Sequence, residues 1–273
     1  MENFDTLHSQ TDVNPLNRKS IRFVLVEPSH PGNIGATARA IKTMGFSELV
    51  LVSPQTFPHP DAFARASGAT DILDNCHIVD SLDDAISECE LIIGTSVRER
   101  QITWPTSTPR ETAERITHFL KEGSQNIAIL FGRERTGLEN HELDSAQWQI
   151  RIPANKQYNS LNLASAVQII AYEINCQFDE EVMELSNKEV DKVAKSNLAK
   201  RQRLATHTEM QAYYHHLEET LHQLDFIKTN PPTKLLRKIN RLYNRANVSF
   251  EELQILRGIL TATQKAIQNK LNN

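Results

Sequence analysis

Short apolar segments recur along the first two thirds of the chain, and helical stretches separate them. Their nearly continuous Ile, Val and Leu content is typical of strands that are buried on both faces, as in a parallel sheet. Six such segments alternating with helices predict an α/β domain with a doubly wound, mostly parallel sheet over residues 21–176. The segments are "IRFVLV", "ELVLVS", "HIVD", "ELIIGTS", "NIAILFG" and "WQIRIPA".

Helix start signals lie between these segments. In "TPRETAERITHFLKEG" the order of residues predicts Thr108 as N-cap, Pro109 at the first helical position and Glu111 two residues later, with Gly123 as the stop. Ser81 in "SLDDAISEC" resembles a second N-cap. These signals support helices as the connections between the expected strands.

The composition changes after residue 176. "FDEEVMELSNKE" is acidic and without a strand pattern, which favours a linker or a helix start at 177–188. Residues 189–226 contain neither Pro nor Gly, and as one helix they would extend about 57 Å. Because this length exceeds the width of a small domain, we expect the helix either to bend or to project away to meet a partner. "TNPPT" interrupts the pattern, and two shorter helices follow, the second capped by Ser249 with Glu252 at its third position. We expect a disordered tail at 1–20, the α/β domain at 21–176, a linker at 177–188 and a small all-α domain at 189–273.

The bulk composition excludes several classes of protein. A hydrophobic content of 39%, a charged content of 23% and a net charge of −4 describe an ordinary globular protein rather than one that coats nucleic acid through overall charge. The three cysteines are scattered, which predicts neither a disulfide framework nor a thiolate metal site. Since no apolar run approaches the length of a membrane span and the amino terminus has no apolar signal region, we expect a cytoplasmic protein.

The stretch "PSHPGNIGATARAIKTMG" directly follows the first expected strand. A strand, a Gly-bearing turn and a helix are where open α/β sheets bind ligands. The dinucleotide pattern G-x-G-x-x-G is absent, because Gly32 and Gly35 have the wrong spacing, and this counts against a nicotinamide-dependent enzyme. The turn therefore predicts an anion site of another kind.

Three more segments follow expected strands, namely "GTSVRER", "LFGRERTGL" and "IPANKQYNSLNLASAVQIIAYE". Because strand ends on one side of an open sheet converge on a crevice, these segments and the first turn are expected to share one site.

The combination of motifs resembles the SPOUT superfamily of RNA methyltransferases. The patterns N-x-G-x-x-x-R, FGxExxGL and IPxxxxxxSLNxxxAxxxxxYE appear in order between Asn33 and Glu173. With "EPSHPGN", "TSVRER" and "GRERTGL", the sequence is most similar to the branch called TrmJ. That branch methylates the ribose 2'-oxygen of cytidine or uridine 32 in the tRNA anticodon loop. The resemblance is strong over residues 21–176 and general over the helical tail.

The resemblance implies S-adenosylmethionine as cofactor, bound inside a C-terminal trefoil knot made by the last strands and helix of the α/β domain. The positions that match the cofactor site of the family are loop residues whose backbone can contact a ligand. They are Thr95, Ser96, Val97, Gly132, Glu134, Ile152, Asn159, Ser160 and Leu161.

The same resemblance assigns the catalytic positions to Asn33, Arg39, Ser160 and Asn162. Since a guanidinium keeps its proton up to a pH of about 12, we interpret Arg39 as a group that grips the phosphate beside the target ribose. The proton would leave through that phosphate, Ser160 or water. Ser160 also fits the N-cap of the last helix of the domain.

Basic residues are predicted to hold the RNA. Four arginines flank the two central loops, and "KTNPPTKLLRKINRLYNR" in the tail is basic throughout, with Tyr243 as a residue that could stack on a base. The predicted RNA-binding residues are Arg98, Arg100, Arg133, Arg135, Lys234, Arg237, Lys238 and Arg241. The resemblance further implies a homodimer in which each site is completed by the partner's Arg39.

Two alternatives stay open at this point. Ribosomal RNA could be the substrate, since sister families share the three motifs, or the chain could be a catalytically silent RNA-binding protein of the same fold. A metal site could be imagined at His215, Glu219 and His222. Because these residues lack an H-E-x-x-H spacing, we interpret them as a solvated surface and expect no metal.

Overall fold

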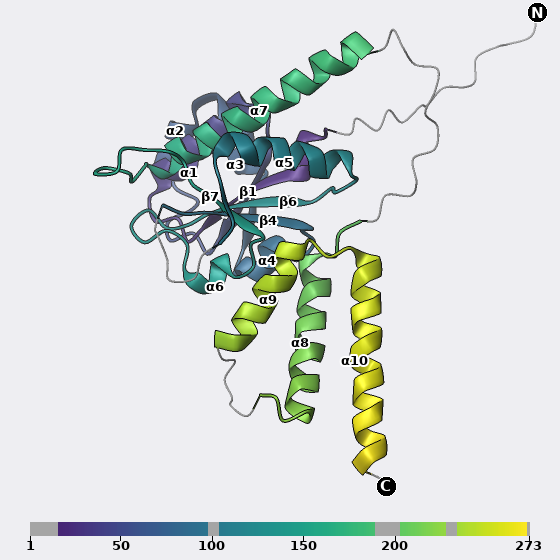
Figure 1. The fold of residues 1–273 in the computed structure, drawn as a ribbon. Coiled ribbons are helices and arrows are strands. Elements are labelled where there is room, and N and C mark those ends of the chain that lie inside the picture. Colours follow the sequence, from purple (N-terminus) through teal and green to yellow (C-terminus); the bar gives the residue numbers. More distant parts are fainter. Residues whose placement is uncertain (1–15, 98–103, 189–202, 228–233, 272–273) are drawn as a thin grey trace, which may run out of the picture.

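The structure is a computed structural model that describes residues 16–97, 104–188, 203–227 and 234–271 (Figure 1). Its centre is a seven-stranded sheet in which every pair of neighbouring strands is parallel. The strand order is β3-β2-β1-β6-β4-β7-β5. The strands are β1 (Ile21–Val26), β2 (Glu48–Val52), β3 (His77–Val79), β4 (Leu91–Thr95), β5 (Thr106–Ser107), β6 (Ile127–Phe131) and β7 (Trp148–Ile150).

All six expected strands are confirmed, and β5 was missed. With two residues, one exposed, β5 has no apolar run that a sequence pattern could detect.

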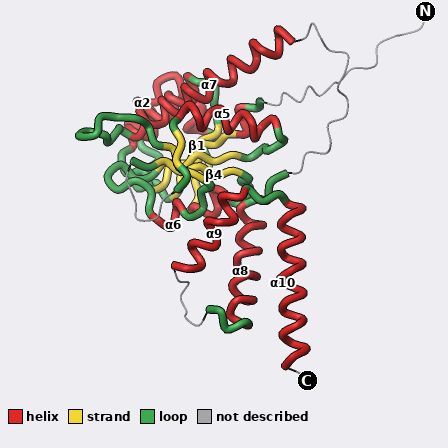
Figure 2. Tube along the Cα trace, viewed as in Figure 1, coloured by secondary structure: helices red, strands yellow, loops and turns green. Residues whose placement is uncertain are grey.

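Helices cover both faces of the sheet, which confirms the doubly wound arrangement (Figures 1 and 2). Alternate residues of β1 point to opposite faces, so that Phe23 and Leu25 join one buried cluster while Val24 and Val26 join the other. The first face carries α1 (Pro31–Thr43), α2 (Pro60–Ala66), α3 (Thr70–Asp74), α5 (Pro109–Lys121) and α7 (Leu163–Lys188). The second carries α4 (Leu82–Ile86) and α6 (Asn140–Leu143), and short 3-10 turns lie at Arg18–Ser20 and Ser67–Ala69.

The expected cap of α5 is confirmed. The Thr108 side chain accepts from the Glu111 N–H, while the Glu111 carboxylate accepts from the Thr108 N–H at 2.7 Å. Such reciprocal pairs satisfy two backbone donors that a helix start leaves open.

Gly35 of α1 serves packing rather than ligand binding. A Cβ at this position would lie 1.9 Å from the carbonyl oxygen of Ala62 in α2. The glycine therefore allows the two helices to approach closely, which a larger residue would prevent.

Two expectations about the tail were wrong. The segment at 177–188 is the last part of α7 and not a linker between elements. The helix of 189–226 is not continuous, because α8 (His207–Gln223) begins only after Thr206, which forms a capping box with Glu209. Residues 203–205 are not helical, and Leu204 pairs with Ser249 in an isolated bridge.

The three helices α8, α9 (Lys234–Ala246) and α10 (Phe250–Leu271) form a module below the face of the sheet that carries α4 and α6 (Figure 1). The expected cap of α10 is confirmed, since Ser249 accepts from the Glu252 N–H. Tyr243 packs edge-on against Tyr213, with ring centroids 5.1 Å apart, so it belongs to the apolar core of this module rather than to an exposed stacking platform.

Hydrogen bonds to backbone carbonyl groups fix α8 to the sheet domain. The His207 N–H donates to the Cys89 carbonyl at 2.9 Å, and the Thr208 hydroxyl donates to the Ser87 carbonyl at 2.9 Å. In the described part of the chain, no helix is both long and apolar enough to cross a membrane.

Candidate functional site

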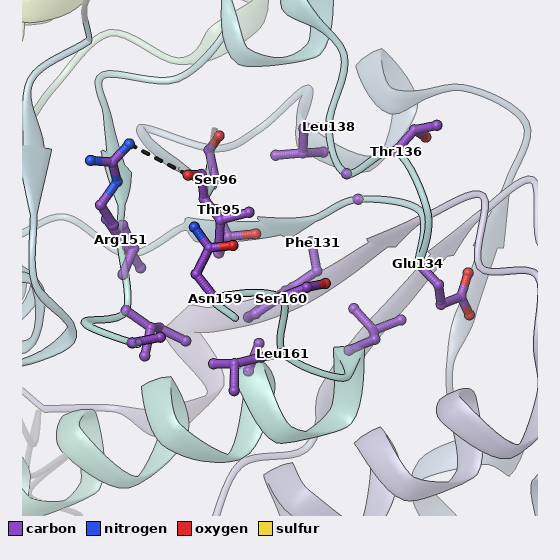
Figure 3. A pocket seen from close by; sticks show the side chains of 18 of the residues that line it. Thr95, Ser96, Phe131, Glu134, Thr136, Leu138, Arg151, Asn159, Ser160 and Leu161 are labelled. Carbon is purple, nitrogen blue, oxygen red and sulfur yellow. Dashed lines mark hydrogen bonds between the residues drawn. The ribbon is translucent and has the colours of Figure 1, made fainter. Parts of the chain in front are cut away.

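A cavity of about 1090 Å³ lies at the carboxyl ends of β4, β6 and β7 (Figure 3). Three segments that are far apart in the sequence line it: 95–97, 131–138 and 150–166. The structure brings all nine expected cofactor positions to this cavity: Thr95, Ser96, Val97, Gly132, Glu134, Ile152, Asn159, Ser160 and Leu161. Their role as cofactor ligands stays a prediction.

Backbone forms one wall of the cavity. Directly after β6 the chain turns back on itself, and the Gly137 N–H donates to the Arg133 carbonyl at 2.8 Å. A Cβ at Gly132 would lie 2.1 Å from the Leu138 nitrogen, so a side chain there would collide with the returning strand. The glycine lets the two backbone stretches lie against each other and leaves their polar groups beside the cavity.

Glu134 connects the β6 loop to the start of α1. Its carboxylate accepts from the N–H groups of Ser29 and His30, each at 3.1 Å, from the Ser29 hydroxyl at 2.8 Å and from the Asn33 side-chain amide at 3.0 Å. The expected anion site at this turn therefore holds a carboxylate of the protein itself, at the positive end of the helix dipole. Figure 3 shows Glu134 on the opposite side of the cavity from Arg151.

These contacts keep Glu134 ionised. Burial by itself raises the pKa of Glu134, but the hydrogen bonds from Asn33 and Ser29 outweigh it and lower the pKa to about 2. At neutral pH a negative charge thus lies between the first turn and the cavity.

Asn33 and Asn162 meet beside the cavity. The Asn162 amide donates to the Asn33 side-chain oxygen at 2.9 Å, and the Asn162 oxygen accepts from the N–H groups of Ala164 and Ser165. Asn162, and not Ser160, therefore caps α7. Asn33 also donates to Glu134. The Asn33 side chain therefore connects the three motifs, because Asn33, Glu134 and Asn162 belong to one motif each.

Arg39 is placed differently from the other expected catalytic residues. It lies in α1 with an exposed side chain, and it is not among the described residues that line the cavity. Arg98 and Arg100 lie outside the described residues.

Arg133 occupies an ion-pair network rather than an open rim. Its guanidinium donates to Glu27 through Nε at 2.9 Å and to Glu142 through Nη1 at 3.0 Å. The bond to Arg133 holds the pKa of Glu27 below its usual range. With 18% of its side chain exposed, Arg133 fastens the β6 loop to β1 and α6, whereas Arg135 is exposed at the cavity.

The basic residues of α9 also divide into two kinds. The Arg237 Nε lies 2.6 Å from the Asp144 carboxylate, and the Arg241 guanidinium covers the Trp104 ring at 4.2 Å from its centroid. Lys234 and Lys238 are exposed. Two of the four expected RNA-binding residues of this helix thus contact the sheet domain.

Sequence reasoning missed Arg151, which lines the cavity and donates to the Val97 carbonyl at 3.5 Å. Its position directly after β7 was a usable signal, because that strand ends at the same edge as β4 and β6. Ser29 was missed as well, although it follows the end of β1.

Comparisons with known proteins agree with this geometry. The family model described as "SpoU rRNA Methylase family" matches residues 20–172, and a second model, "tRNA methyltransferase TrmJ, C-terminal domain", matches residues 208–272. Among the described residues, no group of three or more His, Cys, Asp or Glu side chains could hold a metal ion.

Curated relatives match nearly the whole chain. A protein of Pseudomonas aeruginosa named "tRNA (cytidine/uridine/adenosine-2'-O-)-methyltransferase TrmJ" is 46% identical over 90% of this chain and 94% of its own length. The Escherichia coli "tRNA (cytidine/uridine-2'-O-)-methyltransferase TrmJ" is 41% identical over 93% and 98%. The crystal structure of TrmJ from Z. mobilis superposes with a TM-score of 0.73 at 29% identity, covering 89% of this chain and 98% of that one. The chain therefore belongs to the SpoU methylase family and, within it, to the group of TrmJ proteins.

Proposed function

We propose that this protein transfers the methyl group of S-adenosylmethionine to a ribose 2'-oxygen of tRNA. The observation that carries the proposal is the meeting of three motifs at one cavity, where Asn33 is hydrogen-bonded to both Glu134 and Asn162. Relatives that cover nearly the whole chain are named as tRNA 2'-O-methyltransferases, which supports tRNA as the substrate.

The residues around the cavity fit such a cofactor. The close approach of backbone at Gly132 leaves a wall of peptide groups, which can contact a nucleoside and an amino acid without a bulky side chain between them. The segments 95–97, 131–138 and 150–161 would hold the cofactor. When bound, it supplies a methyl group on a positively charged sulfur, ready for attack by an oxygen nucleophile.

The chain itself has to position the ribose and manage one proton. Asn33, Ser160 and Asn162 lie beside or along the cavity as uncharged hydrogen-bonding groups for the sugar. Arg39 grips the phosphate next to the target ribose and offsets the negative charge that develops on the 2'-oxygen. The proton passes to that phosphate, to Ser160 or to water, because a guanidinium does not accept it at neutral pH.

The active form is a homodimer in which Arg39 of one chain serves the cavity of the other. The exposure of Arg39 and its absence from the lining of its own cavity support this arrangement. A protein that sediments as a monomer while fully active would contradict it.

The proposal also covers three finer features: the nucleotide that is methylated, the topology of the chain and the cellular compartment. The target is cytidine or uridine 32 of the anticodon loop, the segments after β6 form a trefoil knot, and the protein acts in the cytoplasm where tRNA is found. Family membership supports all three. An experimental structure in which the chain from β6 to α7 can be pulled straight without passing through a loop would contradict the knot.

The function is tested with methyl-labelled S-adenosylmethionine and total RNA. Label is expected in tRNA, and digestion followed by mass spectrometry is expected to place it on the ribose of nucleotide 32. Label in ribosomal RNA alone would favour the alternative substrate, and label in neither RNA would favour the silent RNA-binding protein.

A further inference from the structure

Tyr158 lies in the loop that leads from β7 to α7. Its side chain is 82% exposed, which makes it the most exposed large apolar side chain in the described part of the chain. Lys156 and Asn159, on either side of it in the sequence, line the cavity at the carboxyl ends of β4, β6 and β7 (Figure 3). Tyr158 is not among the described residues that line it. The ring therefore lies outside the space proposed for the cofactor.

The other four tyrosines of the chain have partners within it. In α8 and α9, three tyrosine rings pack against one another, and Tyr172 of α7 forms a hydrogen bond with Cys176. Within the described residues, Tyr158 has no such ring contact and no side-chain hydrogen bond. Its aromatic face is thus accessible to a ligand.

Two hydrogen bonds fix the backbone at Tyr158. The Asn155 side-chain oxygen accepts from the Gln157 N–H at 2.9 Å, and the Asn155 carbonyl accepts from the Tyr158 N–H at 3.0 Å. Asn155 and Tyr158 also form an isolated antiparallel bridge. Because the turn is already formed within the chain, a ligand that contacts the ring does not have to order the turn first.

This turn is connected directly to the residues proposed for the reaction. Ser160 is two residues beyond Tyr158, so their Cα atoms are at most about 7 Å apart. Asn162 follows two residues later, where it caps α7 and donates to Asn33. A nucleotide whose ribose meets these groups can therefore place its base against Tyr158.

The base of that nucleotide has no partner among the groups assigned so far. Asn33, Ser160 and Asn162 are proposed to contact the ribose, and Arg39 the phosphate. Without a contact to the base, the nucleotide could turn away from the methyl donor, and the advantage of fixed orientation would be lost. Bases of single-stranded RNA loops commonly stack on aromatic side chains, and every base offers a face for this contact.

We propose that Tyr158 stacks on the base of the nucleotide that is methylated and so holds its ribose in place for the transfer. This inference rests on the proposed function and adds to it a contact with the base. Because stacking does not involve the hydrogen-bonding edge of the base, Tyr158 fixes the orientation of the nucleotide without choosing between bases.

The test removes the contact from either side. Methylation is measured as kcat/KM with unmodified tRNA and with the same tRNA carrying an abasic ribose, which keeps its 2'-hydroxyl, at the target nucleotide. On the intact tRNA, Tyr158→Ala is expected to lower kcat/KM by about tenfold to a hundredfold, as for the loss of one stacked base. On the abasic tRNA, the wild type and Tyr158→Ala are expected to have equal kcat/KM.

Two variants control for the loss of an aromatic ring. Tyr158→Phe keeps the ring and is expected to retain the kcat/KM of the wild type. Phe226→Ala removes a ring that is 62% exposed and lies beyond the end of α8, and it is also expected to retain this value. An equal loss of kcat/KM in Tyr158→Ala on both tRNAs would overturn the inference, because the residue would then act without the base.

Further measurements separate the other outcomes. Calorimetric titration with S-adenosylmethionine is expected to give equal cofactor affinity for the wild type and Tyr158→Ala, and sedimentation is expected to give the same oligomeric state. A weaker cofactor affinity or a changed oligomeric state would overturn the inference, since the ring would then serve the cavity or a second copy of the chain. Wild-type kcat/KM in Tyr158→Ala would overturn the inference alone, whereas a wild type that methylates no tRNA would overturn the proposed function itself.

Discussion

The two cavities of this molecule are built from different components. At the cavity that we propose binds the cofactor, which we call the cofactor cavity, loops are fixed by short hydrogen bonds, and Glu134, Asn33 and Asn162 all have partners within the chain. At a second cavity of about 480 Å³, between Trp104 of the sheet domain and α9, the helix presents long cationic side chains, and Lys238 and Arg245 are exposed. Under the proposed function, the first cavity holds groups at fixed positions for a reaction, while the exposed cations of α9 can adapt to a flexible polyanion.

Arg39→Ala provides the largest contrast between the two sites. The methylation rate at saturating tRNA and cofactor is expected to fall by about a thousandfold, because charge stabilisation in the transition state is lost. The affinity for tRNA is expected to change only modestly. Single-turnover methylation and filter binding measure the two effects.

Arg39→Lys and the double variant Lys238→Ala/Arg245→Ala complete this comparison. Lysine keeps the charge but not the planar, bidentate geometry, so wild-type activity in Arg39→Lys would contradict the phosphate grip. Lys238→Ala/Arg245→Ala is expected to show the reverse pattern, with weaker tRNA binding and a nearly unchanged rate at saturation.

Gly132→Ala tests the backbone wall of the cofactor cavity. The added methyl group would meet the Gly137–Leu138 backbone, and the free energy of unfolding is expected to fall by about 3 kcal/mol, together with cofactor affinity. Gly258→Ala is the matched control, because no atom lies within 4 Å of a Cβ at that exposed helical position. The control is expected to stabilise the protein by up to about 1 kcal/mol in urea unfolding. Similar unfolding curves for the two variants would contradict the close backbone contact.

Glu134→Gln is expected to have a smaller effect that depends on pH. The variant loses charge-assisted hydrogen bonds to Ser29 and Asn33, and we expect a destabilisation of about 1 to 2 kcal/mol at neutral pH. In the folded wild type the pKa of Glu134 is about 2, below its ordinary value of 4.5, so the unfolded chain binds this proton first as pH falls. The stabilisation is complete above pH 4.5 and is lost between there and pH 2.

Urea unfolding of both proteins across this range checks the prediction. The difference in the free energy of unfolding between the wild type and Glu134→Gln should be constant above pH 5 and should shrink toward zero near pH 2. A difference that does not change with pH would show that the carboxylate charge is not what stabilises the turn.

Local patterns were sufficient to predict much of the fold and of the site. The apolar runs predicted six strands because burial on both faces demands such runs, and the rule that strand ends converge brought Thr95, Gly132 and Ile152 to one cavity. The caps of α5 and α10 depend on residues three positions apart, so they were visible in the sequence as well.

Contacts between distant residues could not be predicted in this way. Arg133 resembled a rim cation in the sequence, but its partner Glu27 is more than a hundred residues away and appears only when β1 and β6 pair. Arg237 resembled an RNA contact, but Asp144 meets it only after α9 has packed below α6. A lone charged residue has the same sequence signature whether it is solvated or paired.

The short helix α6 has a consequence for how this enzyme can change over evolution. Within four residues and its C-cap, Glu142 holds the loop after β6 through Arg133, while Asp144 holds the basic helix α9 through Arg237. A substitution that displaces α6 would disturb both partners at once. Tolerance to mutation should therefore be lower at this small surface element than its size suggests, and compensating changes should arise in pairs on its two sides.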